Sequence, residues 1–113
     1  GSYIVMEYLA LGGRCDQYEF GKAMAAMHLA PPSAPEALAG SFGFPVANTI
    51  GGTPQPNTWD DDWVRFFREQ RIGHQIKLAR EPQLDSLWSK VLADTNNLED
   101  LFQGISVKPS VLH

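Results

Sequence analysis

The residues best suited to chemistry in this 113-residue chain are three histidines and a run of three aspartates. His28, His74 and His113 do not lie at metal-ligand spacing from one another or from a cysteine. The aspartates at 60–62 could hold a divalent cation, but negative charge is also favoured in the first turn of a helix. The helix-start interpretation fits this run better, so we predict no metal ligand.

Other catalytic motifs are absent from the sequence. It contains no G-x-S-x-G, no Walker A and no C-x-x-C, and Gly51-Gly52-Thr53 lacks the lysine of a phosphate-binding loop. The net charge of -4 and the lack of a Lys/Arg cluster argue against nucleic-acid binding. No apolar run is long enough for a membrane span. With 43% hydrophobic and 19% charged residues, the composition is typical of a folded globular protein.

The first elements that position these residues are a strand and a helix. Residues 3–9 form a nearly continuous apolar run with β-branched and aromatic side chains, which predicts a buried strand. After two glycines, Asp16 is placed to cap a helix that reaches about Leu29, where Pro31-Pro32 stops it. Residues 32–40 are rich in Pro, Ala and Ser and predict an exposed loop.

The second half of the chain predicts mostly helix. Residues 42–57 are dense in Gly, Pro and Asn yet carry several apolar side chains, so we expect an ordered segment without regular structure. Thr58 is the expected N-cap of a long helix reaching about Ala79, and Pro82 starts another with an apolar stripe. A short helical turn is expected over residues 98–102. The predicted fold class is therefore mainly α.

The order of a buried strand, glycines and a helix resembles the hinge of the protein-kinase-like fold. By this resemblance Met6 is the gatekeeper, the Glu7 carbonyl accepts from the adenine amino group, and the Leu9 N–H donates to the adenine ring. Tyr8 lies between them. Adenine offers one donor and one acceptor along its edge, and an exposed strand end supplies their complements.

The segment F-G-F-P-V-A-N-T-I-G-G-T-P-Q-P-N-T-W, from Phe42 to Trp59, carries a more specific resemblance. Together with D-D-W-V-R-F-F at residues 61–67 and R-I-G-H-Q at 71–75, it is similar to the signature of the fructosamine and ketosamine kinases. The runs at 17–22 and 48–51 most resemble members from plants and photosynthetic microbes. The resemblance implies an internal fragment of a protein-kinase-like fold: residues 1–13 hold the last small-lobe strand and hinge, and residues 14–113 the helical first half of the large lobe.

The resemblance also implies an activity. The family uses ATP and Mg to phosphorylate the 3-hydroxyl of ketoamines on glycated proteins, such as fructosamines and ribulosamines, which leads to deglycation. Its catalytic base is the Asp of an H-G-D motif, and here His113 immediately precedes the expected Gly-Asp. No catalytic residue is therefore expected within the chain, which alone is predicted to be inactive and to bind neither ATP nor Mg. The expected location is the cytoplasm or a plastid.

Two questions stay open at this stage. The polar residues Asn48, Gln55 and Asn57 either hold their own loop or line the ketoamine pocket, and Trp59 either packs in the core or joins them. The alternative to an enzyme fragment is a non-catalytic helical module for binding or self-association. We also expect the lone strand at 3–9 to pair with a second copy, giving a homodimer, or to stay disordered.

Overall fold

The structure is a computed structural model that describes residues 1–112, so the predicted role of His113 lies outside the described residues. Its elements, in chain order, are α1 (Gln17–Leu29), α2 (Pro35–Leu38), β1 (Asn48–Ile50), β2 (Thr53–Gln55), α3 (Trp63–Phe66), a π-helix (Phe67–Gly73), α4 (His74–Ala79), α5 (Pro82–Asp94) and a 3₁₀ helix (Glu99–Phe102). Helices dominate, and the described residues contain one small two-stranded sheet. This agrees with the predicted mainly α class.

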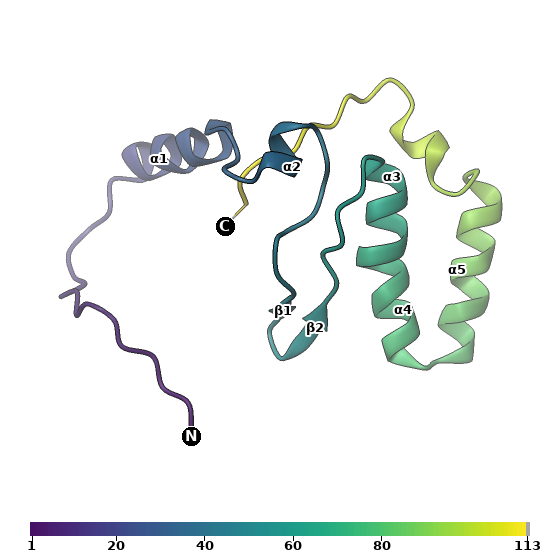
Figure 1. Cartoon of the computed structure of the whole chain (residues 1–113), viewed down its shortest axis with the longest axis horizontal. Helices are drawn as coiled ribbons and strands as arrows, with labels where there is room; N and C mark the ends of the chain where they lie inside the picture. Colours follow the sequence, from purple (N-terminus) through teal and green to yellow (C-terminus); the bar gives the residue numbers. More distant parts are fainter. Residues whose placement is uncertain (113) are drawn as a thin grey trace.

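One continuous helical rod organises the second half of the chain. The segments α3, π-helix and α4 follow one another without a break, and α5 runs back beside them (Figure 1). Arg80 makes the turn between α4 and α5 in the left-handed conformation, with φ of 51°. The predicted end at Ala79 and the predicted start of α5 at Pro82 are both confirmed.

The predicted start of the rod at Thr58 is wrong. Asp62 is the N-cap, and its Oδ1 accepts a hydrogen bond from the Arg65 N–H at 2.9 Å. The reason is a long-range pairing: the N–H and C=O of Asp60 bond to Phe42 at 3.0 and 2.7 Å in an antiparallel bridge. Because this bridge needs extended backbone at Asp60, the helix can begin only after it.

Residues 48–55 form a β-hairpin, where the sequence predicted no regular structure. β1 and β2 are antiparallel, with Asn48 opposite Gln55 and Ile50 opposite Thr53. Gly51 and Gly52 make the connection, and Gly51 has φ of 58°. A two-residue turn with positive φ matches the twist of hairpin strands, which accounts for the glycine pair.

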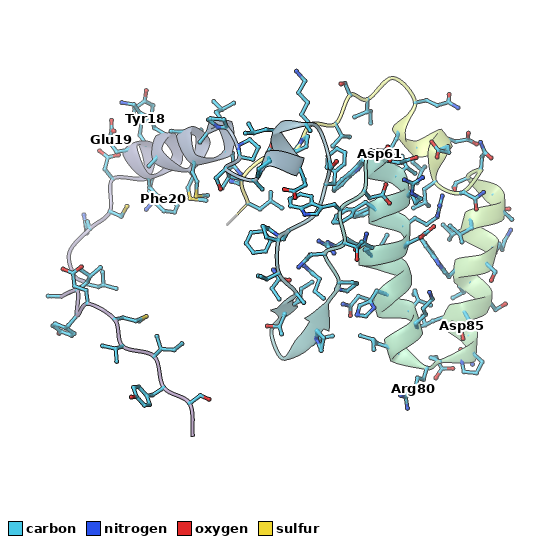
Figure 2. All side chains as sticks on the ribbon, in the orientation of Figure 1. Tyr18, Glu19, Phe20, Asp61, Arg80 and Asp85 are labelled. Carbon is cyan, nitrogen blue, oxygen red and sulfur yellow. The ribbon has the colours of Figure 1, made fainter. Side chains whose placement is uncertain are left out.

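Helix α1 follows its predicted bounds. The Asp16 Oδ1 accepts from the N–H groups of Tyr18 and Glu19 at 2.9 and 3.2 Å, and the helix ends at Leu29 before the proline pair. No residue of α1 is buried; Tyr18 and Phe20 project from it in Figure 2. The predicted loop at 32–40 contains the short helix α2.

The strand predicted over residues 3–9 does not form. These residues belong to no helix or strand, and Tyr3, Val5 and Tyr8 are each at least 85% exposed. In Figure 1 the N-terminal segment stands apart from the rest of the chain. A strand is held by hydrogen bonds to a neighbouring strand, and none of the described residues pairs with this segment.

The core is small and aromatic. Its buried hydrophobic residues are Phe42, Val64, Phe66 and Leu98. Trp63 lies 5.1 Å from the Phe42 ring centroid and 5.5 Å from that of Phe67, and Phe67 in turn meets Phe102 at 6.2 Å. This chain of rings joins the segment before the hairpin, the helical rod and the 3₁₀ helix. The radius of gyration is 18.1 Å, against about 13 Å for a compact domain of this length.

The apolar stripe of α5 is only partly covered. Leu87 is 60% exposed and Val91 40%, although the sequence pattern predicted a core-facing stripe. Phe44, Val46 and Ile50, which are among the apolar side chains of the segment at 42–57, are also more than half exposed. Within residues 1–112, no helix combines the length and apolar character that a membrane span requires.

Candidate functional site

The hairpin brings three of the four predicted substrate residues together. The register places Asn48 opposite Gln55, and Asn57 follows two residues later. The Asn48 Oδ1 accepts from Asn57 Nδ2 at 2.7 Å and from Gln55 Nε2 at 3.4 Å. Asn57 Nδ2 also donates to the Val46 carbonyl at 3.2 Å. The three side chains therefore form one amide cluster across the base of the hairpin.

Asn57 is the buried member of this cluster, at 6% exposure. Both ends of its amide are used, since its Oδ1 accepts from Arg71 Nη2 at 2.7 Å. Asn48 is exposed, and no hydrogen bond between the described residues uses its Nδ2. The geometry thus suits Asn57 to holding the hairpin and Asn48 to meeting a ligand.

Arg71 supports the cluster from the π-helix. Besides Asn57, its guanidinium donates through Nη1 to the Pro56 carbonyl at 2.7 Å, and it lies 4.4 Å from the centroid of the Phe66 ring. Burial lowers the pKa of Arg71 from its ordinary value, because the charged form loses hydration. Within residues 1–112, no ion pair joins Arg71 to a carboxylate, so neutral oxygens and an aromatic face hold this cation.

Two further side chains of the rod reach the hairpin. Gln70 Nε2 donates to the Thr58 carbonyl at 2.7 Å, and His74 Nε2 lies 2.8 Å from the Pro54 carbonyl. A carbonyl only accepts, so the second contact requires the proton on Nε2. The oxygens Gln55 Oε1 and Gln70 Oε1 are buried without a partner among the described residues, which leaves acceptor capacity beside the cluster.

Trp59, the fourth predicted substrate residue, lies outside the amide cluster. It is half-buried and packs over the backbone of Gly43: a Cβ built on Gly43 would lie 2.7 Å from Trp59 Cε3 and 2.9 Å from the Asn57 carbonyl. No side chain fits in that space. This contact is the packing role that the sequence left open for Trp59.

The predicted nucleotide contacts at Met6, Glu7, Tyr8 and Leu9 are not brought to the hairpin. They lie on the separate N-terminal segment, with Met6 79% and Leu9 61% exposed. No hydrogen bond between the described residues uses the Glu7 carbonyl or the Leu9 N–H. This segment therefore offers an acceptor and a donor two residues apart, which are the groups that an adenine edge requires.

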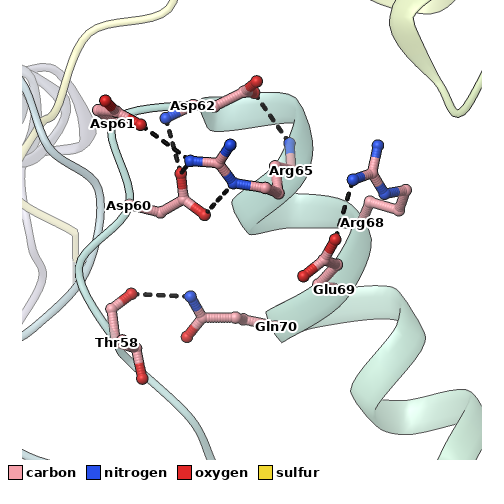
Figure 3. A network of polar contacts seen from close by, with 8 residues as sticks. All are labelled: Thr58, Asp60, Asp61, Asp62, Arg65, Arg68, Glu69 and Gln70. Carbon is pink, nitrogen blue, oxygen red and sulfur yellow. Dashed lines mark hydrogen bonds and ion pairs between the residues drawn. The ribbon is translucent and has the colours of Figure 1, made fainter.

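The three aspartates at 60–62 are committed to local structure (Figure 3). Arg65 binds Asp60 through Nε and Nη2, and its Nη2 also meets Asp61 Oδ1 at 2.9 Å. The hydrogen bond from Arg65 holds the pKa of Asp60 below its ordinary value of 3.8. Asp62 caps the rod. Over residues 1–112, no group of three His, Cys, Asp or Glu side chains could hold a metal ion.

His28 and His74 both have structural contacts. His28, at the end of α1, places Nδ1 2.9 Å from the Val111 carbonyl and so ties the C-terminal segment to the helix. Figure 1 shows that segment returning towards α1 and α2.

Sequence reasoning missed Arg71, His74 and Gln70 as parts of the site. Their spacing was one signal, because positions 70, 71 and 74 face one side of a helix. The π-helix and the partner carbonyls could not be inferred from that spacing. His74 was among the residues suited to chemistry, and Arg71 and His74 lie in the R-I-G-H-Q run of the family signature, but neither signal connected them to the hairpin.

Comparison with known proteins identifies the lineage. The fructosamine kinase family matches residues 1–113. A chloroplastic protein-ribulosamine 3-kinase of Arabidopsis thaliana is 44% identical over 115 residues, covering 100% of this chain and 34% of the relative. A probable ketoamine kinase of Synechocystis is 48% identical over 81 residues, covering 70% of this chain and 25% of the relative. A probable ketoamine kinase of Vibrio cholerae is 34% identical, with 99% and 37% covered.

The family match implies a kinase-like fold, and the dominant helices and small sheet agree with it. The chain belongs to the fructosamine kinase family, as the segment from Phe42 to Trp59 indicated. Plant and cyanobacterial proteins are among the relatives, which confirms that part of the resemblance. The chain spans about a third of the length of the curated relatives that it matches end to end.

Proposed function

We propose that these residues are part of an ATP- and Mg-dependent kinase that phosphorylates the 3-hydroxyl of protein-bound ketoamines. The observation that carries the proposal is the family match across residues 1–113. The relatives named as ribulosamine and ketoamine kinases support a fructosamine- or ribulosamine-type substrate. Phosphorylation of the sugar labilises it and frees the amine, so the activity is a repair of glycated proteins in the cytoplasm or a plastid.

The amide cluster is the proposed contact for the ketoamine. Ketoamine sugars present hydroxyl and carbonyl oxygens, and side-chain amides bind such groups through paired donors and acceptors. Asn48 is exposed and its Nδ2 is unused, while the unused Oε1 of Gln55 is buried beside it. Asn57 acts by holding them, and Trp59 by packing beneath the same segment.

The N-terminal segment is the proposed adenine contact. The unpaired Glu7 carbonyl and Leu9 N–H fit the edge of adenine, with Met6 and Tyr8 beside them. The described residues do not fit a magnesium ion, because their carboxylates at 60–62 are bound to Arg65 or cap a helix. We therefore assign no step through the metal to these residues, and we propose that the 113-residue chain by itself is inactive.

A second candidate function rests on the exposed apolar residues 3–9. Their unpaired backbone suits strand pairing, so a self-association module that forms a homodimer is the alternative. Light scattering on the intact protein and on the 113-residue chain distinguishes the two. A dimer that depends on residues 3–9, without kinase activity, favours the module.

The test of the kinase is ATP-dependent phosphorylation of fructosyl-lysine and ribulosyl-lysine by the intact protein. We expect release of ADP and formation of the sugar 3-phosphate, which phosphorus NMR detects. The matched control substrate is the 3-deoxy ketoamine, which lacks the acceptor oxygen and should give no phosphate ester. Equal ADP release with the 3-deoxy compound, or none with any ketoamine, would refute the proposal.

A further inference from the structure

The contacts between the helical rod and the hairpin follow a regular order. Gln70, Arg71 and His74 bind the carbonyls of residues 58, 56 and 54 respectively, so the two segments run antiparallel. Alternate residues of an extended strand present their backbone groups on the same side. Three side chains of the rod thus occupy the edge of β2 and its extension where a third strand would otherwise pair.

The prolines explain why side chains can do this. Residues 54 and 56 have no N–H, so this edge offers carbonyl oxygens there and no competing donors. Arginine has only donors, while the Gln70 amide and the His74 ring each turn a donor to the edge. The T-P-Q-P-N-T run therefore makes an acceptor edge, and the rod supplies the matching donors.

Arg71 has a consequence beyond this edge because it fixes the orientation of an amide. A guanidinium cannot accept a hydrogen bond, so Asn57 must turn Oδ1 towards Arg71, at 2.7 Å. Its Nδ2 then faces Asn48, and Asn48 must turn its own Oδ1 inward to accept at 2.7 Å. The remaining group, Asn48 Nδ2, is left as a donor on the exposed side of the hairpin.

We propose that Arg71 is a positioning residue that, through Asn57, sets Asn48 Nδ2 as a hydrogen-bond donor to an oxygen of the sugar substrate. This inference rests on the proposed function only for the identity of the ligand. The relay of orientation from Arg71 to Asn57 to Asn48 exists without a ligand. It makes Asn48 specific for an acceptor oxygen and unable to accept from a sugar hydroxyl at the same position.

The relay is tested first without substrate, by NMR of the side-chain amide protons in the intact protein. Arg71→Lys replaces a planar fork that reaches two acceptors by a single ammonium group, so the Asn57 Nδ2 protons should shift and exchange faster. Arg68→Lys is the matched control, since Arg68 is also in the π-helix but donates to the Asn97 carbonyl and Glu69. Unchanged Asn57 amide signals in Arg71→Lys would overturn the relay, whatever the activity of the protein.

The role in binding is tested by steady-state kinetics with fructosyl-lysine. Asn48→Asp keeps the inward oxygen but removes the donor, and should raise the KM for the ketoamine about tenfold, as expected for one polar contact. Arg71→Lys should raise the same KM, while kcat stays within about twofold and the KM for ATP is unchanged. Arg68→Lys should change none of these constants.

The outcomes separate the two proposals. A general loss of folded protein would lower kcat and leave KM unchanged. That result for both Asn48→Asp and Arg71→Lys overturns the positioning role. If Arg71→Lys fails to fold, Asn48→Asp on the hairpin surface still decides the substrate contact. If the wild-type protein phosphorylates no ketoamine, the proposed function fails, and the NMR comparison still decides the relay.

Discussion

Arg65 holds Asp60 with two nitrogens of its guanidinium: Nε lies 2.8 Å from Oδ2, and Nη2 lies 2.6 Å from Oδ1. The same Asp60 pairs its backbone with Phe42. One residue therefore joins the start of the helical rod to the segment that precedes the hairpin.

This pair predicts a pH dependence of stability. The pKa of Asp60 is lowered in the folded protein, chiefly by its hydrogen bond with Arg65, so the unfolded chain binds the proton more tightly. The stabilisation is present above the ordinary value of 3.8 and is lost as the pH falls through the lower folded pKa. Urea unfolding of the intact protein between about pH 2 and 6 should show this loss, and Asp60→Asn should show a smaller dependence. Asp61→Asn, at an exposed carboxylate bound by the same arginine, is the control. Identical pH dependence in wild type and Asp60→Asn would contradict this account.

The N-cap assignment predicts a difference between two nearby substitutions. Asp62→Ala removes the acceptor of the Arg65 N–H and should destabilise the protein by about 1 kcal/mol. Thr58→Ala, at the position that the sequence favoured, should have almost no effect because only its backbone carbonyl is used. Thermal unfolding of the two variants measures these changes in stability. A larger loss of stability for Thr58→Ala than for Asp62→Ala would instead support a helix that begins at Thr58.

The π-helix predicts that Gly73 accepts no side chain. A Cβ at this position would lie 2.6 Å from the Arg68 carbonyl oxygen, which is backbone and cannot move aside cheaply. Gly73→Ala should therefore cost about 2 kcal/mol. Gly21→Ala, in the exposed α1 with open space around it, should stabilise by about 0.5–1 kcal/mol. Chemical denaturation of both variants gives the comparison, and equal effects would argue against the π-helical geometry.

The contact between His74 and the Pro54 carbonyl should protect backbone amides from hydrogen exchange locally rather than across the whole chain. Loss of its contact with the Pro54 carbonyl in His74→Ala should speed hydrogen exchange of the Thr53 and Gln55 amides. Exchange in α1 should not change. His74→Gln, which keeps a donor, should restore part of the protection. Uniform acceleration across the chain would instead indicate a general loss of stability.

The sequence was sufficient where the signals were local. Asp16 predicted the start of α1, and Pro82 that of α5, because capping and proline act within one turn. It failed at Thr58, where the pairing of Asp60 with Phe42 overrides a plausible cap. It failed also for the strand at 3–9, whose apolar pattern indicates burial but cannot supply a partner.

The candidate site was predictable to a similar extent. The nearness of Asn48, Gln55 and Asn57 follows from a two-residue turn at Gly51-Gly52, a signal that was present but interpreted as irregular structure. Arg71 was not predictable, because its importance comes from the widened turn of the helix that carries it. Residue type alone did not separate it from Arg68.

The seven-residue π-helix also determines how the helical rod responds to a change in its length. A π-turn accommodates one more residue than an α-turn, so deleting one residue between 67 and 73 would return the backbone to ordinary helix. Because the widened turn holds the extra residue, the residues after it would keep nearly the same direction around the rod axis. His74 would then still face the hairpin, and α4 would keep the same face towards α5. The same deletion within an ordinary α-helical stretch would rotate every later residue by about 100°. The loss of one residue is therefore better tolerated between 67 and 73 than elsewhere in the rod.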